Sequence, residues 1–227
     1  MKKVILISGG GDGLGSVIAS NLSKNHQVII VGRTQETLNK VAQNTGCDFE
    51  VCDISEIQQV KDTIKKIEGK YKKIDVLINN ASVWIQGELE QNEPDQIQKT
   101  ININTTGTIL FTKEVASVMQ KHKEGLIINI NSQGGFYAKA ERSIYTATKW
   151  AITGFTKSIQ LELAKYGIRV TGLYPGKMKT NMFTKVGIKK DMSDALDPEE
   201  VARTIAFLIE SGPNVVFPEI GIKNINN

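Results

Sequence analysis

Short, continuous apolar runs alternate with amphipathic segments along most of the chain. The runs are VILIS at 4–8, HQVIIVG at 26–32, DFEVCD at 48–53, IDVLIN at 74–79, GLIININ at 125–131, IRVTGLY at 168–174 and NVVF at 214–217. Runs of Val, Ile and Leu without polar alternation are typical of strands that are buried on both faces, as in a parallel sheet covered by helices. The pattern therefore predicts about seven parallel strands.

The segments between these runs predict helices at about 13–25, 34–45, 55–70, 105–122, 143–166 and 198–211. Asp197-Pro198 marks the start of the last helix, with Asp as N-cap and Pro at the first helical position. Strands alternating with helices predict an α/β fold: a Rossmann-like, doubly wound parallel β-sheet flanked by helices. No linker or repeat divides the chain, so we expect a single domain over residues 1–227.

One segment, 175–196, is long and lacks clear periodicity, so we expect it to be a loop that covers the substrate. The tail at 218–227 has no clear assignment.

Composition excludes several classes of protein. The 227 residues are 40% hydrophobic and 23% charged, and a net charge of +4 with scattered lysines gives no reason to expect nucleic acid. Two cysteines, Cys47 and Cys52, and two histidines, His26 and His122, do not form a metal-binding pattern, so no metal is expected. The first apolar run is too short for a signal peptide and no run approaches membrane-spanning length. We expect reduced thiols and a cytoplasmic protein without a membrane partner.

The first predicted strand leads into a glycine-rich turn that opens a helix. The turn has the pattern Gly-x-x-x-Gly-x-Gly at Gly9, Gly13 and Gly15, with Gly11, Asp12 and Leu14 between them. Glycine lets backbone approach a pyrophosphate, and the helix N-terminus attracts the anion. A structural turn is the alternative for such a motif by itself, but its place between strand and helix favours a nucleotide site.

The end of the second strand bears on the choice of cofactor. An NAD site usually has a carboxylate there, whereas this chain has Gly32 followed by Arg33-Thr34. A guanidinium suits the 2′-phosphate of NADP(H). Asp12 in the phosphate loop argues the other way unless it points to solvent, and Arg33 can also be read as a solvated arginine. The sequence favours NADP(H), with NAD(H) possible.

Three residues predict a carbonyl-binding site. Tyr145 and Lys149 are four apart on a predicted helix and so share one face, and Ser132 ends a buried strand. Tyrosine has a pKa of about 10, and each positive charge nearby, from Lys149 or an oxidised nicotinamide, is expected to lower it by roughly 1–3 units. Ser132 would polarise the carbonyl. The alternative is an ordinary surface Tyr–Lys pair and a Ser that merely ends a strand.

Over nearly its whole length the chain resembles the single-domain short-chain dehydrogenase/reductases. The motifs are the glycine turn at 8–15, Asp53 after the third strand, Asn79-Asn80-Ala81-Ser82 after the fourth, Asn104, Ser132, Tyr145-x-x-x-Lys149 and Tyr174-Pro175-Gly176, with Thr180 soon after the last. Seven motifs in the right order are specific, although each is weak alone. Ser8 and Ser82 stand where the family usually has Thr and Gly, and the C-terminal segment lacks the glycine-rich ending of ketoacyl-carrier-protein reductases.

The resemblance implies a role for each matched position. Asp53, with Ile54 beside it, would bind the adenine ring, although Asp53 could instead cap the helix near 55. Asn80 and Ala81 would lie along the cofactor. The remaining contacts to the cofactor would come from Tyr145, Lys149, Pro175, Gly176 and Thr180.

Asn104 would extend a proton relay by holding a water behind Lys149. A buried Asn that caps a helix at 105 is the alternative for this position.

These motifs together predict an NADP(H)-dependent oxidoreductase that transfers a hydride reversibly between nicotinamide and a ketone, aldehyde or alcohol. Asn104, Ser132, Tyr145 and Lys149 are the predicted catalytic residues. The alternative is a catalytically silent dinucleotide-binding redox sensor. A sugar-nucleotide epimerase or dehydratase fits less well, because too few residues follow Pro175 for its usual C-terminal domain.

The resemblance also implies a small-molecule substrate and a homodimer or homotetramer packed through the helices at 105–122 and 143–166. The substrate pocket is expected to be apolar, and its candidate lining residues are Trp84, Phe136, Met178, Met182, Phe183 and Val186.

Overall fold

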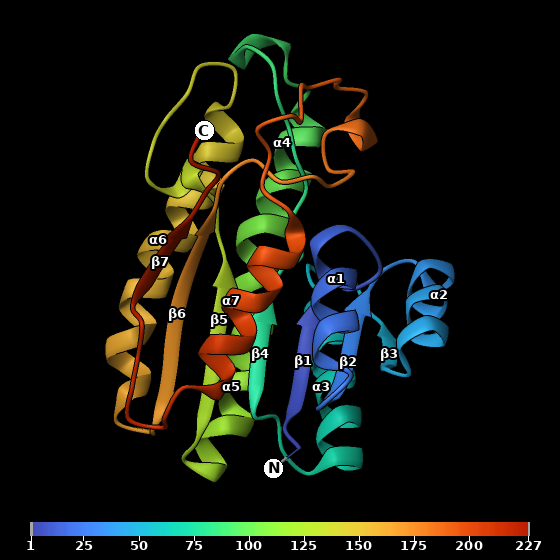
Figure 1. The fold of residues 1–227 in the computed structure, drawn as a ribbon, viewed down its shortest axis with the longest axis vertical. Helices are drawn as coiled ribbons and strands as arrows, with labels where there is room; N and C mark the ends of the chain where they lie inside the picture. The colour runs from blue at the N-terminus through green and yellow to red at the C-terminus, as the bar shows by residue number, and fades with distance from the viewer. Residues whose placement is uncertain (1, 227) are drawn as a thin grey trace.

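A seven-stranded parallel sheet forms the centre of the computed structural model, which describes residues 2–226 (Figure 1). The strand order is β3-β2-β1-β4-β5-β6-β7. The strands are β1 (Val4–Ser8), β2 (Gln27–Gly32), β3 (Asp48–Val51), β4 (Val76–Asn79), β5 (Gly125–Ile130), β6 (Ile168–Pro175) and β7 (Glu219–Ile222). This arrangement confirms the predicted doubly wound α/β fold. The order reverses between β1 and β4, where open α/β sheets bind their ligands beyond the carboxyl ends of the strands.

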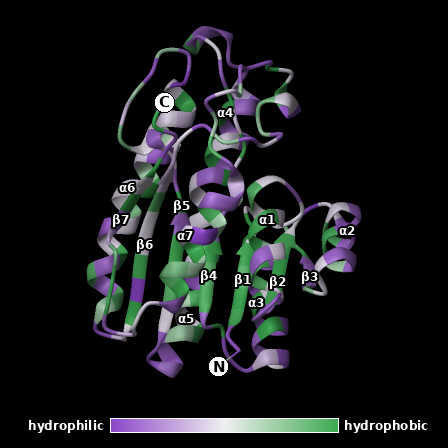
Figure 2. Ribbon diagram, viewed as in Figure 1, coloured by the Kyte–Doolittle hydropathy of each residue, from purple (hydrophilic) through white to green (hydrophobic). Residues whose placement is uncertain are grey.

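Helices cover both faces of the sheet, as Figure 1 shows. One apolar core lies between the sheet and α1 (Gly13–Leu22), α2 (Gln35–Thr45) and α7 (Pro198–Glu210). The other lies between the sheet and α3 (Ile57–Tyr71), α5 (Thr108–His122) and α6 (Ser143–Ala164). The apolar residues of the strands face these two cores alternately, which explains why β1 and β4 are buried throughout and strongly hydrophobic in Figure 2.

All six predicted helices are present, and the ends of each lie within three residues of the predicted bounds. The helix predicted to begin at 105 is preceded by α4 (Pro94–Ile101) and by a π-helical turn at Asn102–Gly107, so the helical segment begins at Pro94. Pro94 at the first helical position begins it, as Pro198 begins α7. The alternative of Asn104 as a helix cap is therefore wrong, because Asn104 lies inside the π-helical turn.

The last strand was predicted in the wrong place. Residues 214–217 have high β propensity but form no strand, and β7 follows at Glu219–Ile222, inside the tail that had no assignment. The chain must first cross from the end of α7 to the sheet edge. Arg169 holds this crossing by donating hydrogen bonds to the carbonyls of Gly212 and Val215, at 3.2 and 3.0 Å. Tertiary structure thus overrides local propensity here.

A buried polar network joins α6 to the sheet. The Asn79 side chain donates to Thr112 Oγ1 at 2.7 Å and to Asn129 Oδ1 at 2.8 Å, and Asn129 donates to Thr156 Oγ1 at 2.8 Å. All four side chains are buried. Because buried polar groups are costly unless hydrogen-bonded, this network selects one position of α5 and α6 on β4 and β5.

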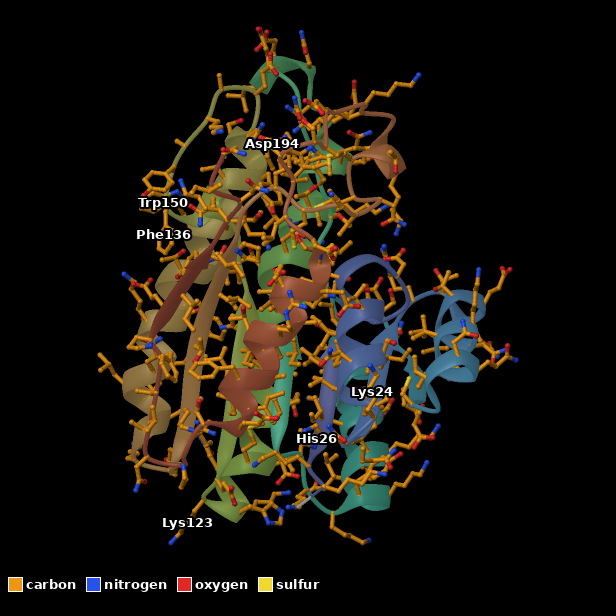
Figure 3. The ribbon with its side chains drawn as sticks, in the orientation of Figure 1. Lys24, His26, Lys123, Phe136, Trp150 and Asp194 are labelled. Carbon is orange, nitrogen blue, oxygen red and sulfur yellow. The ribbon has the colours of Figure 1, made fainter. Side chains whose placement is uncertain are left out.

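Two large apolar side chains of α6 face outward: Leu161 is 83% exposed, and Trp150, labelled in Figure 3, is 52% exposed. The expected homo-oligomer remains a prediction. Within residues 2–226, no helix is both long and apolar enough to span a membrane.

Replacement of Asn129 by Ala is expected to lower the free energy of unfolding by about 2 kcal/mol, because Asn79 and Thr156 each lose a buried hydrogen-bond partner. Urea unfolding followed by circular dichroism measures this. The matched control is Asn25→Ala at an exposed position, which should change stability by no more than about 0.5 kcal/mol. Equal effects of the two substitutions would contradict the proposed importance of the network.

Candidate active site

A cavity of about 850 Å³ opens at the carboxyl ends of the strands. In Figure 1 the segments that follow β4 and β6 lie above these ends, at the top of the molecule, and the glycine turn lies lower, beyond the end of β1. It brings together residues from the glycine turn, the ends of β2, β4, β5 and β6, the start of α6 and the segment 175–196. The predicted residues that line it are Gly9, Gly11, Asp12, Gly13, Leu14, Arg33, Thr34, Asp53, Ile54, Asn80, Ala81, Ser132, Tyr145, Lys149, Pro175, Gly176 and Thr180. Gly15 and Asn104 are not in the lining.

The glycine turn has the geometry of an anion cradle. Gly13 has φ +51°, a left-handed conformation that favours glycine, and it begins α1. A Cβ on Gly15 would lie 2.1 Å from the carbonyl oxygen of Gly9, so Gly15 serves the close packing of the helix on the turn. Asp12, the N-cap residue, makes no side-chain cap hydrogen bond. The backbone N–H groups at this helix end are therefore not capped by its carboxylate.

Asp12 instead forms an ion pair with Lys185 of the segment 175–196. This contact partly neutralises the Asp12 carboxylate, whose negative charge in the phosphate loop would otherwise disfavour a bound anion. It also ties the segment to the glycine turn. The segment contains a short 3₁₀ turn at Thr184–Val186 and a β-bridge between Met178 and Leu196.

The ends of β1 and β4 are joined by hydrogen bonds. The Ser8 hydroxyl accepts from the backbone N–H groups of Asn80 and Ala81, at 3.1 and 3.2 Å. The Asn80 side chain donates to the carbonyl of Gly9 at 3.0 Å. Ser8, at the position where the resemblance leads one to expect Thr, therefore supplies the hydroxyl that joins the two strand ends.

Arg33 and Asp53 lie together at the rim of the cavity, with Arg33 Nη1 3.8 Å from Asp53 Oδ2. Arg33 remains 48% exposed at its side chain, so its guanidinium is accessible. The Asp53 carboxylate also accepts hydrogen bonds from the backbone N–H and the hydroxyl of Ser55, at 3.0 and 2.6 Å, just before α3. Asp53 thus shapes the turn before the helix as well as lining the cavity.

Ser132, Tyr145 and Lys149 converge at the inner end of the cavity. Ser132 acts on the ionisation of Tyr145, and its Oγ accepts a hydrogen bond from the Gly134 N–H at 3.1 Å. Lys149 Nζ lies 5.6 Å from the Tyr145 ring centroid and donates to the carbonyl of Ile130 at 3.3 Å. Tyr145 and Lys149 are 5% and 3% exposed. The ordinary surface pair considered as the alternative is therefore wrong.

Burial controls the ionisation of this pair. It raises the pKa of Tyr145 to about 12, against the opposing effects of the Ser132 hydrogen bond and the Arg142 charge. It lowers the pKa of Lys149 to about 8. The lowering of the tyrosine pKa expected from Lys149 is therefore not found: desolvation of the phenolate dominates, and the charge that opposes it is that of Arg142. At neutral pH the phenol keeps its proton, as a proton donor requires.

Asn104 is buried, and its side-chain hydrogen bonds go to Val83 and Thr148 and not to Lys149. Its side chain accepts from the Val83 N–H at 2.8 Å and donates to the Val83 carbonyl at 2.9 Å and to Thr148 Oγ1 at 3.3 Å. These bonds fix the backbone next to Trp84, whose ring centroid is 4.3 Å from that of Tyr145. The water-holding role of Asn104 stays a prediction.

Most of the expected apolar lining is present. Trp84, Met178, Met182, Phe183 and Val186 line the cavity. Phe136 does not: it stacks on Tyr174 with centroids 3.8 Å apart and lies on the α6–β7 side of the molecule (Figure 3).

Several cavity residues were not singled out from the sequence, among them Thr37, Lys139, Arg142, Asn181 and Lys190. Lys139 and Arg142 directly precede α6, whose Tyr145 and Lys149 the sequence did single out. That closeness in the sequence is the only signal that could have found them. Within residues 2–226 no group of His, Cys, Asp and Glu side chains is arranged to hold a metal ion.

Comparisons with known proteins agree with this geometry. Residues 3–191 match the family model described as short chain dehydrogenase. The carbonyl reductase family member 4 of Xenopus tropicalis is 31% identical over 220 residues, which cover 93% of this chain and 92% of that protein. The solved structure of ElxO with NADP bound is 29% identical with a TM-score of 0.89, covering 98% of this chain and 97% of that one. Actinorhodin polyketide ketoreductase with NADPH is 26% identical with a TM-score of 0.91, covering 98% and 96%.

The chain therefore belongs to the short-chain dehydrogenase/reductase family. It is an oxidoreductase that acts on CH–OH or C=O groups.

Carbonyl reduction is expected to lose activity as pH rises through about 8. Below that pH Lys149 carries its charge, and Tyr145, with a pKa of about 12, stays protonated throughout. The pH profile of kcat/KM measures this, and Lys149→Arg, which keeps the charge, should remove the falling limb. A rate that is flat to about pH 10, or a limb that Lys149→Arg leaves in place, would contradict the assignment.

Proposed function

We propose that this protein is an NADP(H)-dependent reductase of ketones or aldehydes, in which residues 1–227 work as one nucleotide-binding domain and segment 175–196 as the substrate loop. One observation carries the proposal: a single cavity extends from the glycine turn to the half-buried Ser132 and the buried Tyr145 and Lys149. Its dimensions suit a dinucleotide together with a small substrate. ElxO and actinorhodin ketoreductase, whose solved structures contain NADP and NADPH, support the choice of cofactor.

The residues present fit the cofactor. The uncapped start of α1 and the close-packed Gly15 provide a cradle for the pyrophosphate. Asp53 and Ile54 would bind the adenine, Asn80 and Ala81 would line the middle of the site, and Pro175, Gly176 and Thr180 would contact the nicotinamide end. When bound, the cofactor supplies the hydride that reduces the carbonyl carbon.

The side chains at the inner end supply the remaining chemistry. Tyr145 gives its proton to the carbonyl oxygen as general acid. Ser132 keeps a hydroxyl hydrogen with which to hold and polarise the same oxygen, because its contact with Gly134 uses only a lone pair. Lys149 provides positive charge near the phenol while the proton leaves. In the alcohol-oxidising direction the same groups act in reverse, and the high pKa of Tyr145 favours reduction at neutral pH.

Arg33 supports NADP(H) over NAD(H), because its accessible guanidinium lies at the end of β2, where a 2′-phosphate would be placed. A phosphate would join Asp53 as an anionic neighbour of the same guanidinium. A bidentate guanidinium–phosphate contact is stronger than an exposed ion pair. Arg33 can therefore bind the phosphate even if its ion pair with Asp53 is weakened.

Replacement of Tyr145 by Phe is expected to lower kcat by about 10²–10⁴-fold, because the proton donor is removed while the ring and its contacts stay. The dissociation constant for NADPH, measured by fluorescence titration, should change by less than about 3-fold. Tyr166→Phe makes the same chemical change outside the cavity lining and should leave turnover unchanged. If Tyr145→Phe weakened NADPH binding as much as it slowed turnover, Tyr145 would be structural.

Replacement of Arg33 by Ala is expected to weaken NADPH binding by about 10–100-fold and to leave NADH binding nearly unchanged, because a charge-assisted contact to the 2′-phosphate is lost. Calorimetric titration with both cofactors measures this, with Lys40→Ala at an exposed position of α2 as the control. Wild-type protein that binds NADH as tightly as NADPH, or an Arg33 variant that loses both equally, would contradict the preference.

A further inference from the structure

The net positive charge of the protein is concentrated in the side chains that line the cavity. Eight basic and four acidic side chains line it, a surplus of four, and the net charge of the whole chain is also +4. Three of the four acids are paired with cations of the same lining: Asp12 with Lys185, Asp53 with Arg33, and Asp194 with Lys177. The fourth, Asp191, accepts hydrogen bonds from Ser193.

Three cations at the substrate end are left without an acidic partner. Among the carboxylates of residues 2–226, none lies within 4.0 Å of the charged atoms of Lys139, Arg142 or Lys190. Glu141 is next to Arg142 in the chain, but its carboxylate accepts a hydrogen bond from Gln86 at 3.3 Å. The cations are therefore available to an anion from outside the protein.

Two of these cations lie against the aromatic wall beside the proton donor. The Arg142 guanidinium is 5.3 Å from the Trp84 ring centroid, and Lys190 Nζ is 4.7 Å from that of Trp84 and 4.0 Å from that of Phe183. Trp84 in turn packs on Tyr145. Arg142 is also close enough to Tyr145 for its charge to oppose the rise in the tyrosine pKa. The positive charge is thus next to the position of the reacting carbonyl.

The cations at this end repel one another. Partial burial lowers the pKa of Lys190 to about 8, and the charges of Arg142, Lys177 and Lys139 add to the effect. The charge of Glu141 opposes this lowering of the pKa, but its effect is smaller and does not reverse it. Grouping like charges in a half-buried place costs free energy, and a bound anion would offset that cost. The pyrophosphate of the cofactor does not serve this purpose, since its cradle is the glycine turn at the start of α1.

We infer that the preferred substrate carries an anionic group, such as a carboxylate, sulfonate or phosphate, close to its carbonyl, and that Arg142 and Lys190 bind this group. The apolar part of the substrate would lie against Trp84 and Phe183. This inference rests on the proposed reductase function and narrows its substrate class from carbonyl compounds in general to oxo acids and their phosphate or sulfonate counterparts.

Matched substrate pairs test the inference. Each oxo carboxylate, with the carbonyl one to four bonds from the carboxylate, is compared with its methyl ester under saturating NADPH, and dihydroxyacetone phosphate is compared with dihydroxyacetone. We expect kcat/KM for at least one anion to exceed that of its neutral partner by about 10-fold or more. The ratio should fall as salt is added, because the recognition is electrostatic. The carboxylate and phosphate pairs separate the two kinds of anion.

Variants assign the effect to residues. Arg142→Gln and Lys190→Gln should each lower kcat/KM for the preferred anion by about 10-fold and leave its neutral partner within about 2-fold. Lys189→Gln is the matched control, because Lys189 is exposed and lies outside the cavity lining. NADPH affinity measured on each variant shows that the protein is folded.

The outcomes separate this inference from the proposed function. Reduction of neutral ketones with no preference for any anion would overturn the inference and leave the reductase intact. An equal fall in kcat/KM for the anionic substrate and for its neutral counterpart in the Arg142→Gln and Lys190→Gln variants would also overturn it. Should NADPH reduce no carbonyl compound at all, the proposed function and the inference would both be wrong.

Discussion

The packing of α6 across β5 and β6 is the constraint on which the site depends. Ser132 follows β5, while Tyr145 and Lys149 are on α6, so their meeting requires the helix to keep one position on the sheet. Apolar contacts alone allow some sliding. The buried hydrogen bonds from Asn129 to Thr156 and from Asn131 to Thr153 and the Lys149 carbonyl have direction, so they fix that position. Chemistry at the end of the sheet thus depends on polar groups buried within it.

The same burial determines the electrostatics of the site. Removing Tyr145 and Lys149 from water favours the neutral form of each group, and this effect is larger than the attraction that the sequence alone suggests between a phenolate and an ammonium. The result is a protonated acid at neutral pH beside a lysine that is charged there but close to titrating. Reduction and oxidation are therefore expected to respond differently to pH.

Much of the fold and site could be predicted from sequence, because the informative signals are local. Each of these signals comes from residues that are close together in the chain. They are the continuous Val and Ile runs of the strands, the turn at Gly9–Gly15 and the Tyr145–Lys149 spacing. The placement of β7 depends on Arg169 holding a distant crossing, and the high pKa of Tyr145 depends on burial, so neither is encoded locally. The sequence shows Asn129 and Asn131 in an apolar run, but it does not predict which residues of α6 they would hydrogen-bond.

The most direct test of the account is the near-ultraviolet absorbance of NADPH when purified protein is mixed with a panel of ketones and aldehydes. The account predicts that absorbance falls with at least one carbonyl compound and that the alcohol product accumulates in equal amount. NADPH that binds tightly but is never oxidised across a broad panel would contradict the reductase and favour a dinucleotide sensor. Failure to bind NADPH or NADH would contradict the nucleotide site itself.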